Sequence, residues 1–366
     1  MESRASVLCA TIVLAVCGAA VSAGAAPKKA SWRFVSIPDF LNCDVRYPEP
    51  KWEDALGYVL QQIKAEDPDF VLVAGDLLMG RWWDGPKQID ELSKVFYTAW
   101  TRRMRDHGLK FYAAVGDHEL GDNPWRGKRL EHVPHYEKAF VKYLKMPRNG
   151  PPGREGLTYS FVHKNVLFVA VDVFERESMG AGKGTATFSG AQVDWLRKTL
   201  AGREEADHVV VMGHTPIVGP VRARASSCLM LKGGRDSPLW QTMKAGGVDL
   251  YLCGEVHAIT CRQVDGIEHI AHGSLFGYVN TVNYLVATVT PKTMRLELKR
   301  IDIILEGGHL PQSHGNRPRE IVRISDEQKK RGFRGVGALM LDKTGGAKRF
   351  RDAKGEFANP YTPPRK

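Results

Sequence analysis

Side chains able to bind metal ions recur at five places in the sequence, each directly after a short apolar run. In chain order these places are Asp39, Gly75-Asp76, Gly116-Asp117-His118-Glu119, Gly213-His214 and Gly254-Glu255-Val256-His257. A glycine before the polar residue lets the chain turn sharply, so that the side chain points back over the end of the strand. One Gly-Asp pair after a strand is usually a turn, but five such endings in register are not expected by chance. Carboxylates and imidazoles gathered at strand ends indicate a site for one or two divalent or trivalent metal ions.

The elements that must position these side chains alternate along the first part of the chain. Strands are predicted over residues 32–37, 70–74 and 110–115, with helices over 52–63 and 91–104 between them. A βαβαβ alternation favours a parallel or mixed sheet, and ligands collect at the carboxyl ends of such strands.

The second half of the chain is predicted to close as sheet. Strands over 157–163 and 166–171 form a pair, and a capping box between Ser189 and Gln192 opens a helix. A strand over 208–212 and a helix over 238–244 follow. The remaining predicted strands cover 248–253, 260–264, 269–272, 284–289 and 294–298.

The order of the five motifs resembles the calcineurin-like metallophosphoesterase superfamily, whose signature runs D-x-H, G-D, G-N-H-[DE], G-H and G-H-x-H. The resemblance extends from about residue 32 to residue 300, and the segments 189–196 and 247–254 also look like that family. It implies an α/β fold, a four-layer αββα sandwich of two mixed β-sheets flanked by helices. It also implies hydrolysis of a phosphate mono- or diester by attack of a metal-bound hydroxide at a dinuclear site.

The resemblance also implies a role for each side chain. Asp76 would bridge two metal ions, and His118 would be catalytic, facing the phosphate to stabilise charge or to protonate the leaving oxygen. The other implied ligands are Asp39 and His257 on the first ion, and Asp117, His214 and Glu255 on the second. Two ions roughly 3.5–4 Å apart lower the pKa of a shared water and bind both oxygens of an in-line displacement.

Three ligand positions depart from the family's signature. Leu41 stands where the first histidine is expected, Asp117 replaces asparagine, and Glu255 replaces the first histidine of the last motif. Four carboxylates then balance two divalent ions, whereas the usual two carboxylates leave a formal charge of +2. We therefore expect Mn or Fe, with Mg, Ca or Zn as alternatives, since hard ions prefer oxygen ligands. Asn42 or Asp44 could replace the missing ligand.

These departures leave two interpretations open. In the first, the chain is an active phosphoesterase, and restoring histidine at Glu255 is expected to restore or raise its activity. In the alternative, it is a catalytically impaired metal- or ligand-binding protein on the same fold.

Two arginines are candidates for binding an anionic substrate. Arg81 follows the second motif and precedes Trp82 and Trp83, and Arg235 lies between the two histidine motifs. A solvated rim or a packed aromatic pair is the other interpretation of these segments. Among the remaining histidines, His272 could line the site, and we expect a surface position for His107, His132, His135, His163 and His208.

Residues 1–25 have the pattern of a signal peptide. No charge occurs from residue 5 to residue 27, residues 6–16 are mostly apolar, and Ala23-Gly24-Ala25 provides a cleavage site. The pattern predicts a secreted or periplasmic protein without a stable transmembrane anchor, and a lipoprotein is less favoured. The mature chain would keep Cys43, Cys228, Cys253 and Cys261, which could form two disulfides in any of three pairings. Cys253 is equally well explained as a small buried apolar side chain.

The composition is typical of a folded soluble protein. Of the 366 residues, 43% are hydrophobic and 25% are charged, which excludes a disordered, collagen-like or membrane-embedded chain. We divide the chain into the signal peptide 1–25, a metallophosphoesterase domain 31–303 and a basic, Gly-rich C-terminal extension 304–366.

The extension carries most of the net charge. Residues 306–366 hold 14 Lys and Arg against 7 Asp and Glu, a balance of +7 out of +11 for the whole chain. Nucleic-acid binding through this segment is disfavoured, because aromatic residues are not interleaved with the basic ones. We expect a mostly solvated or disordered extension, and a phosphorylated small molecule or a phosphodiester as the partner of the domain.

Overall fold

A computed structural model describes residues 31–39, 50–179, 186–203, 206–274, 278–310 and 319–363. The predicted signal peptide lies outside the described residues, and so do Leu41, Asn42, Cys43 and Asp44. Within the described ranges, no helix combines the length and the apolar character that crossing a membrane requires.

The ligand-bearing first half of the chain builds one edge of a seven-stranded sheet, whose order is β15-β14-β11-β10-β1-β2-β3. β1 (Trp32–Ser36), β2 (Phe70–Val73) and β3 (Phe111–Ala113) run parallel, as the βαβαβ pattern predicts. Antiparallel partners follow from later in the chain: β10 (Thr281–Val289), β11 (Thr293–Asp302), β14 (Arg334–Asp342) and β15 (Arg349–Gly355). The helices between the parallel strands are α1 (Pro50–Ala65) and α2 (Pro86–Asp106).

The second sheet has six strands in the order β4-β5-β6-β7-β9-β8. Its strands are β4 (Tyr159–His163), β5 (Val166–Ala170), β6 (His208–Met212), β7 (Leu250–Cys253), β8 (Thr260–Val264) and β9 (Ile267–Ala271). The four central strands β5, β6, β7 and β9 are parallel. Every residue of β5 and β6 is buried, which explains why these strands are nearly continuous apolar runs.

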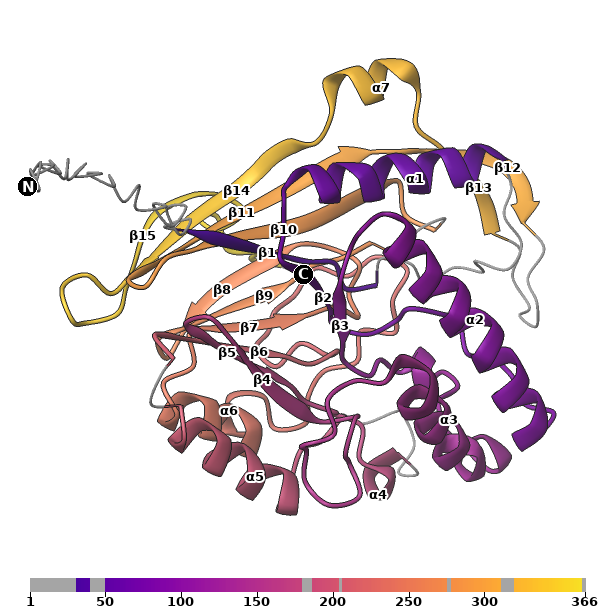
Figure 1. Cartoon of the computed structure of the whole chain (residues 1–366), viewed down its shortest axis with the longest axis horizontal. Coiled ribbons are helices and arrows are strands. Elements are labelled where there is room, and N and C mark those ends of the chain that lie inside the picture. Colours follow the sequence, from indigo (N-terminus) through magenta and orange to yellow (C-terminus); the bar gives the residue numbers. More distant parts are fainter. Residues whose placement is uncertain are drawn as a thin grey trace, which may run out of the picture. The chain divides into compact units, whose positions relative to one another are not determined.

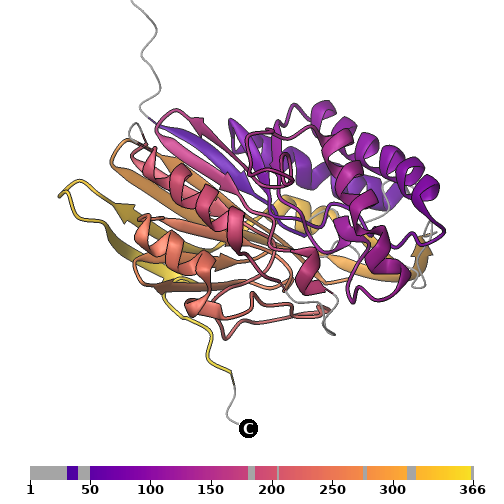
Figure 2. The same cartoon turned by 90° about the horizontal axis from the view of Figure 1, so that it is seen from below.

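The two sheets pack face to face with helices outside them. Figure 1 shows α1 along the outer face of the seven-stranded sheet, and α5 (Gly190–Ala201) and α6 (Pro238–Ala245) beneath the six-stranded sheet. Figure 2, viewed from below, shows α5 and α6 over the outer face of that sheet. Aromatic rings join the sheets in the core: Phe34 of β1 and Phe70 of β2 contact Phe168 of β5, with ring centroids 5.2 and 5.1 Å apart. The predicted sandwich of two mixed sheets flanked by helices is confirmed.

One long helix is absent from the sequence prediction. α3 (Lys128–Leu144) follows the short turn η1 (His118–Leu120) and packs against α2, where Tyr97 and Phe140 bring their ring centroids to 6.1 Å. Pro134 lies inside α3, and such a residue removes a helical hydrogen bond, so the sequence pattern does not predict a continuous helix here.

Most of the C-terminal extension is folded. β14 pairs along the length of β11, and β15 pairs with β14, while β12 (Ile304–Leu310) and β13 (Arg319–Arg323) form a separate pair followed by α7 (Asp326–Arg331). The expectation of a solvated or disordered extension is therefore wrong for its described part. Alternate residues Leu339 and Leu341 of β14 are buried, so the basic composition concealed a strand with one apolar face.

Lysines of this extension also reach the second sheet. Lys343 and Lys348 lie between β14 and β15, and their ammonium groups are 2.7 and 3.2 Å from the buried carboxylate of Asp249, just before β7.

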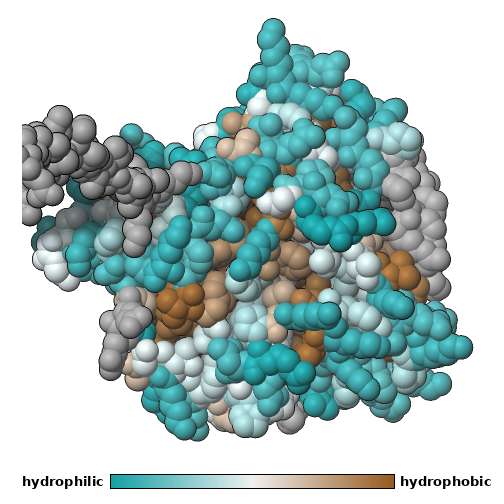
Figure 3. All heavy atoms as spheres, in the orientation of Figure 1, coloured by the Kyte–Doolittle hydropathy of each residue, from teal (hydrophilic) through white to brown (hydrophobic). Residues whose placement is uncertain are grey.

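His208, expected on the surface, is fully buried beside Asp249, whereas the other four histidines of that group are partly exposed. On the face that Figure 3 shows, the surface is mostly hydrophilic, with apolar residues confined to patches.

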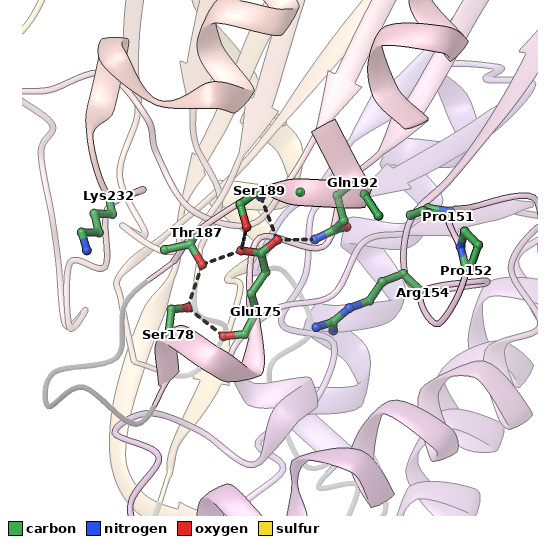
Figure 4. Close-up of a pocket in the computed structure, with 11 residues that line it drawn as sticks. Pro151, Pro152, Arg154, Glu175, Ser178, Thr187, Ser189, Gln192 and Lys232 are labelled. Carbon is green, nitrogen blue, oxygen red and sulfur yellow. Dashed lines mark hydrogen bonds between the residues drawn. The ribbon is translucent and has the colours of Figure 1, made fainter. Parts of the chain in front are cut away.

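The start of α5 differs from the predicted capping box. Ser189 is the N-cap, but its backbone N–H and its hydroxyl both donate to the carboxylate of Glu175, over 2.7 and 2.8 Å (Figure 4). The Gln192 side chain instead bonds Thr158 and the backbone carbonyl of Asp172. A carboxylate from another loop therefore stabilises this helix terminus, and it lines a cavity of about 630 Å³.

Candidate metal centre

The predicted motifs meet where the carboxyl ends of both sheets come together. His214 follows β6, and its Nε2 lies 3.4 Å from Asp76 Oδ2 after β2, 3.2 Å from Asp117 Oδ1 after β3, and 3.4 Å from Glu255 Oε2 after β7. All four side chains are buried. Carboxylates from three different loops, those of Asp76, Asp117 and Glu255, thus lie around one imidazole nitrogen.

Three groups of potential ligand atoms lie within 4.8 Å of one another among the described residues. They are Asp39, Asp76 and His214; Asp76, Asp117 and His118; and Asp117, His214 and Glu255. The third is the set predicted for the second ion, and Asp76, Asp117 and His214 each belong to two of the three groups. His257 belongs to none of the three, although it lines the same pocket. His118, which the resemblance places at the phosphate, belongs to the second group.

Each histidine of the site is oriented by a backbone carbonyl. His214 Nδ1 is 2.7 Å from the Ala74 oxygen, His118 Nδ1 is 2.8 Å from the Met79 oxygen, and His257 Nδ1 is 2.7 Å from the Arg224 oxygen. A carbonyl accepts only, so Nδ1 carries a hydrogen, and in a neutral ring Nε2 then keeps its lone pair. This arrangement is typical of imidazoles that bind metal ions.

Three buried polar atoms at the centre form no hydrogen bond with the residues that the structure describes. They are Asp39 Oδ2, Asp117 Oδ1 and His214 Nε2, of which the last two lie 3.2 Å apart. A buried carboxylate oxygen or imidazole nitrogen without a partner is costly, and all three residues belong to groups whose ligand atoms lie within 4.8 Å of one another. Their chemistry fits a divalent or trivalent cation, so the residues present suit the metal site that the sequence predicts.

The backbone is strained at the ligands themselves. Asp39, Asp76, Glu255 and His257 have φ values of 54°, 60°, 68° and 50°. Non-glycine residues rarely adopt this left-handed region, and they retain it where the surroundings over-determine the conformation. One such contact is the bond from the Glu255 N–H to Asp39 Oδ1, over 3.0 Å.

A comparison with known families agrees with this geometry. The sequence profile of the calcineurin-like phosphoesterases matches residues 49–258, more than half of the 366 residues. The chain belongs to the calcineurin-like phosphoesterase family. Asp39 precedes the matched segment, whereas the other five predicted ligands lie within it. A search of curated proteins finds no match.

Solved structures of low sequence identity are similar to this calcineurin-like phosphoesterase. A dimetal phosphatase from Danio rerio is 15% identical over 72% of this chain and 95% of its own, with a TM-score of 0.49. GAP50, the anchor in the inner membrane complex of Plasmodium, is 16% identical over 80% and 89%, with a TM-score of 0.44. A putative 5′-nucleotidase from Staphylococcus aureus is 16% identical over 70% and 51%, with a TM-score of 0.43.

Two glycines of the family motifs are required for close approach rather than for a turn. A Cβ added to Gly116 would lie 2.2 Å from Asp76 Oδ1, and a Cβ added to Gly254 would lie 2.7 Å from Asp39 Oδ1. Neither glycine has a positive φ. The sequence predicted that glycine allows a sharp turn here. At these two positions it is required instead because a Cβ atom would clash with the carboxylate of a predicted ligand.

Glu119 is a functional residue to which sequence reasoning assigned no role. Its buried carboxylate accepts hydrogen bonds from three backbone N–H groups: Asp76 over 2.7 Å, Leu77 over 2.9 Å and Gly116 over 2.8 Å. It thereby joins the loops after β2 and β3. Burial, followed by the charge of Asp76, raises the pKa of Glu119 to about 7. Its only sequence signal is its place as the acidic residue that ends the third motif.

The charge of the centre is dominated by carboxylates. Burial would lower the pKa of His118, but Asp76, Asp122 and Asp117 outweigh it and raise that pKa to about 10. Burial itself raises the pKa of Asp39 well above its ordinary value, and the charge of Asp76 adds to this effect. A group of anions that attracts protons so strongly also attracts metal cations.

The pocket over the centre has a volume of about 460 Å³. Arg81 lines it, and its guanidinium pairs with Asp122 over 2.5 Å. Arg235 is not among the lining residues and pairs with Asp265 instead. Other lining residues that the sequence analysis did not select are Met79, Asp122, Asn123, Ala225, Ser226, Ser227 and Tyr278.

Other candidate residues have structural surroundings. Trp82 is buried and stacks on Phe96, so the packed-aromatic interpretation holds for it. His272 is buried between Ser36 and Asn283, outside the lining of the pocket. Among the described residues, Cys228, Cys253 and Cys261 form no disulfide with one another, and Cys253 is fully buried within β7.

Proposed function

We propose that this protein is an exported, metal-dependent phosphoesterase that hydrolyses a phosphate mono- or diester. The observation that carries this proposal is the convergence of buried carboxylates and imidazoles from five strand ends beneath a pocket, where Asp39 Oδ2, Asp117 Oδ1 and His214 Nε2 form no hydrogen bond with the described residues. Export to the periplasm or the cell exterior is supported by the signal-peptide pattern of residues 1–25.

The ligand set supports two metal ions. Asp76 would lie between them, with Asp39 on one side and Asp117, His214 and Glu255 on the other. The resemblance adds His257, which lines the same pocket, to the side of Asp39. Bound there, two ions would lower the pKa of a water molecule and neutralise charge on the oxygens of an in-line displacement. Four carboxylates and two imidazoles favour Mn or Fe over Zn, because oxygen ligands suit harder ions.

His118 and Arg81 would act directly on the substrate. His118 Nδ1 is fixed by the Met79 carbonyl, so its Nε2 faces the pocket, 3.9 Å from Asp76 Oδ2 and 3.8 Å from Asp122 Oδ1. From there it is placed to donate a proton to the leaving oxygen, a role that typically contributes about 10²- to 10⁴-fold. Arg81, held by Asp122 at the rim, offers planar N–H donors to phosphate oxygens.

Two variants and one control test this proposal. His118→Ala should lower turnover of an aryl phosphate or a bis-aryl phosphate by about 10²-fold or more while the metal content stays unchanged. Arg81→Ala should mainly raise KM. Arg235→Ala removes an arginine that does not line the pocket and should leave both constants unchanged. Equal effects of the two arginine variants would contradict the placement of the substrate.

One observation favours a second function, a metal- or ligand-binding protein without turnover. Four carboxylates would cancel the charge of two divalent ions, and a neutral centre attracts phosphate less than a cationic one. Stoichiometric metal with no hydrolysis of either ester under added Mn, Fe or Mg would support this alternative. Hydrolysis of either ester would exclude it.

A further inference from the structure

Two ligand positions that depart from the family signature are joined by a chain of hydrogen bonds. Asn123 Nδ2 donates to Asp117 Oδ2 over 2.5 Å and to Ser227 Oγ over 3.2 Å. Ser227 Oγ donates in turn to Glu255 Oε1 over 2.8 Å. These bonds link the loop after β3 to the loop after β7 along the wall of the pocket, and we call them the Asn123-Ser227 bridge.

Asn123 and Ser227 carry enough hydrogens to make all three hydrogen bonds of the bridge at the same time. A primary amide carries two hydrogens on one nitrogen, so Asn123 can serve Asp117 and Ser227 together. A hydroxyl accepts one hydrogen bond while donating its own hydrogen, so Ser227 still serves Glu255. The bridge therefore holds two negative carboxylates with neutral donors alone, and it places no competing cation beside a metal position.

The bridge occupies one oxygen of each carboxylate and leaves the other oxygen free to bind a metal ion. Glu255 Oε1 accepts three bonds, from Ser227, from the Ser226 hydroxyl over 3.0 Å and from the Leu229 N–H over 3.0 Å. The opposite oxygens, Asp117 Oδ1 and Glu255 Oε2, face His214 Nε2 at 3.2 and 3.4 Å. Each carboxylate thus has one oxygen engaged by the protein and one directed at the same imidazole nitrogen.

We propose that Asn123 and Ser227 are positioning residues that hold Asp117 and Glu255 as one-oxygen ligands of the metal position around His214. This inference rests on the proposed function, because it concerns the same centre. A set of carboxylate oxygens and one nitrogen suits an oxygen-preferring ion such as Mn²⁺. Groups that orient metal ligands typically contribute about 10- to 100-fold in metal affinity.

Titration of the purified protein with Mn²⁺ tests the proposal, with a competing chelator giving Kd and elemental analysis giving the number of bound ions. Asn123→Ala and Ser227→Ala should each raise the Kd of the weaker ion by about 10- to 100-fold. Ser189→Ala is the matched control, because it removes the hydroxyl of an exposed serine that donates to a carboxylate, Glu175, outside the metal centre. Its Kd should change by less than about threefold.

Two further variants separate positioning from a purely structural role. Ser227→Thr retains the hydroxyl and should restore the wild-type Kd. The double variant Asn123→Ala with Ser227→Ala should raise Kd no more than the larger single effect, because both substitutions break one bridge. Ser227 is exposed, so replacing it does not perturb the core.

The proposal is overturned if Ser189→Ala and Ser227→Ala raise Kd equally, or if the effects of Asn123→Ala and Ser227→Ala multiply in the double variant. A wild-type protein that binds no metal would refute the proposed function together with this inference. A wild-type protein that binds two ions, with bridge variants that match its Kd, would refute this inference alone.

Discussion

The ion-pair cluster around Asp249 gives a stability prediction that can be worked out from the structure. The carboxylate is fully buried and accepts a hydrogen bond from the Val209 N–H over 2.9 Å. Lys343 and Lys348 approach it from the turn between β14 and β15. The cluster therefore fastens the C-terminal extension to the six-stranded sheet, at the strand ends opposite the metal centre.

The magnitude follows from the pKa of this carboxyl group. Burial alone would raise the pKa of Asp249, but His208, Lys343 and Lys348 outweigh it and lower the pKa from 3.8 to about 2. A difference of that size corresponds to about 2.5 kcal/mol of stabilisation at neutral pH. Because the folded pKa is depressed, this stabilisation is complete above pH 3.8 and is lost as the pH falls toward 2; about half remains at pH 3.

Asp249→Asn keeps the shape of the side chain, removes its charge and leaves Lys343 and Lys348 without a negatively charged partner, although each still donates to a backbone carbonyl. We expect the free energy of unfolding at pH 7 to fall by about 3 kcal/mol, since breaking a buried pair costs about 3–5 kcal/mol. Asp194→Asn removes an exposed carboxylate paired with Arg197 and should cost about 0.5 kcal/mol or less. Urea unfolding of the three proteins between pH 3 and pH 7 measures both effects.

The reasoning would be refuted if Asp249→Asn matched the wild type at pH 7. It would also be refuted if the difference between the two proteins grew as the pH fell from 7 to 3. Either result would mean that the lysines do not stabilise the folded state through this carboxylate.

The remaining predictions concern the metal centre. Gly116→Ala would place a Cβ 2.2 Å from Asp76 Oδ1, so we expect elemental analysis to find at least one metal ion fewer per chain. Gly57→Ala, whose Cβ meets no atom within 4 Å, should bind metal like the wild type, and equal metal content in the two variants would contradict the argument. Glu255→His should lower both metal content and hydrolysis, because the three donors to Glu255 Oε1 would lose their acceptor. This reverses the expectation from sequence that the substitution restores activity, and a higher turnover number would show that the donors do not matter.

The parallel strands and their ligands could be predicted from sequence because their signals are local. An apolar run followed by glycine and an acidic residue predicts a strand. It also predicts that the acidic side chain lies over the carboxyl end of that strand, as Asp76 does after β2. Three of the five motifs have this form, and the order of all five then indicated the family. Local signals of this kind do not depend on knowing which strands pair.

The parts that escaped prediction depend on contacts between distant residues. Glu119 joins the loops after β2 and β3 through backbone N–H groups, which carry no sequence signal. Asn123 and Ser227 are 104 positions apart, and neither belongs to a motif. Ser189 and Gln192 have the spacing of a capping box, but Glu175 from another loop replaces that local arrangement.

Charge composition misled the prediction for the C-terminal extension. Its excess of Lys and Arg is typical of a solvated segment, yet Lys343 and Lys348 are paired with a buried carboxylate. The partner, Asp249, lies 94 and 99 positions earlier in the chain. Net charge alone therefore did not distinguish a solvated basic segment from a folded one whose lysines form ion pairs with buried carboxylates.

The number of metal ions per chain tests the central claim most directly. Elemental analysis of the mature wild-type protein, loaded with Mn²⁺ and freed of excess ion, should find two ions. Asp76→Asn should retain one ion at most, since Asp76 belongs to two of the three ligand groups. A wild-type protein without bound metal, or an Asp76→Asn variant that still binds two ions, would contradict the account of this centre.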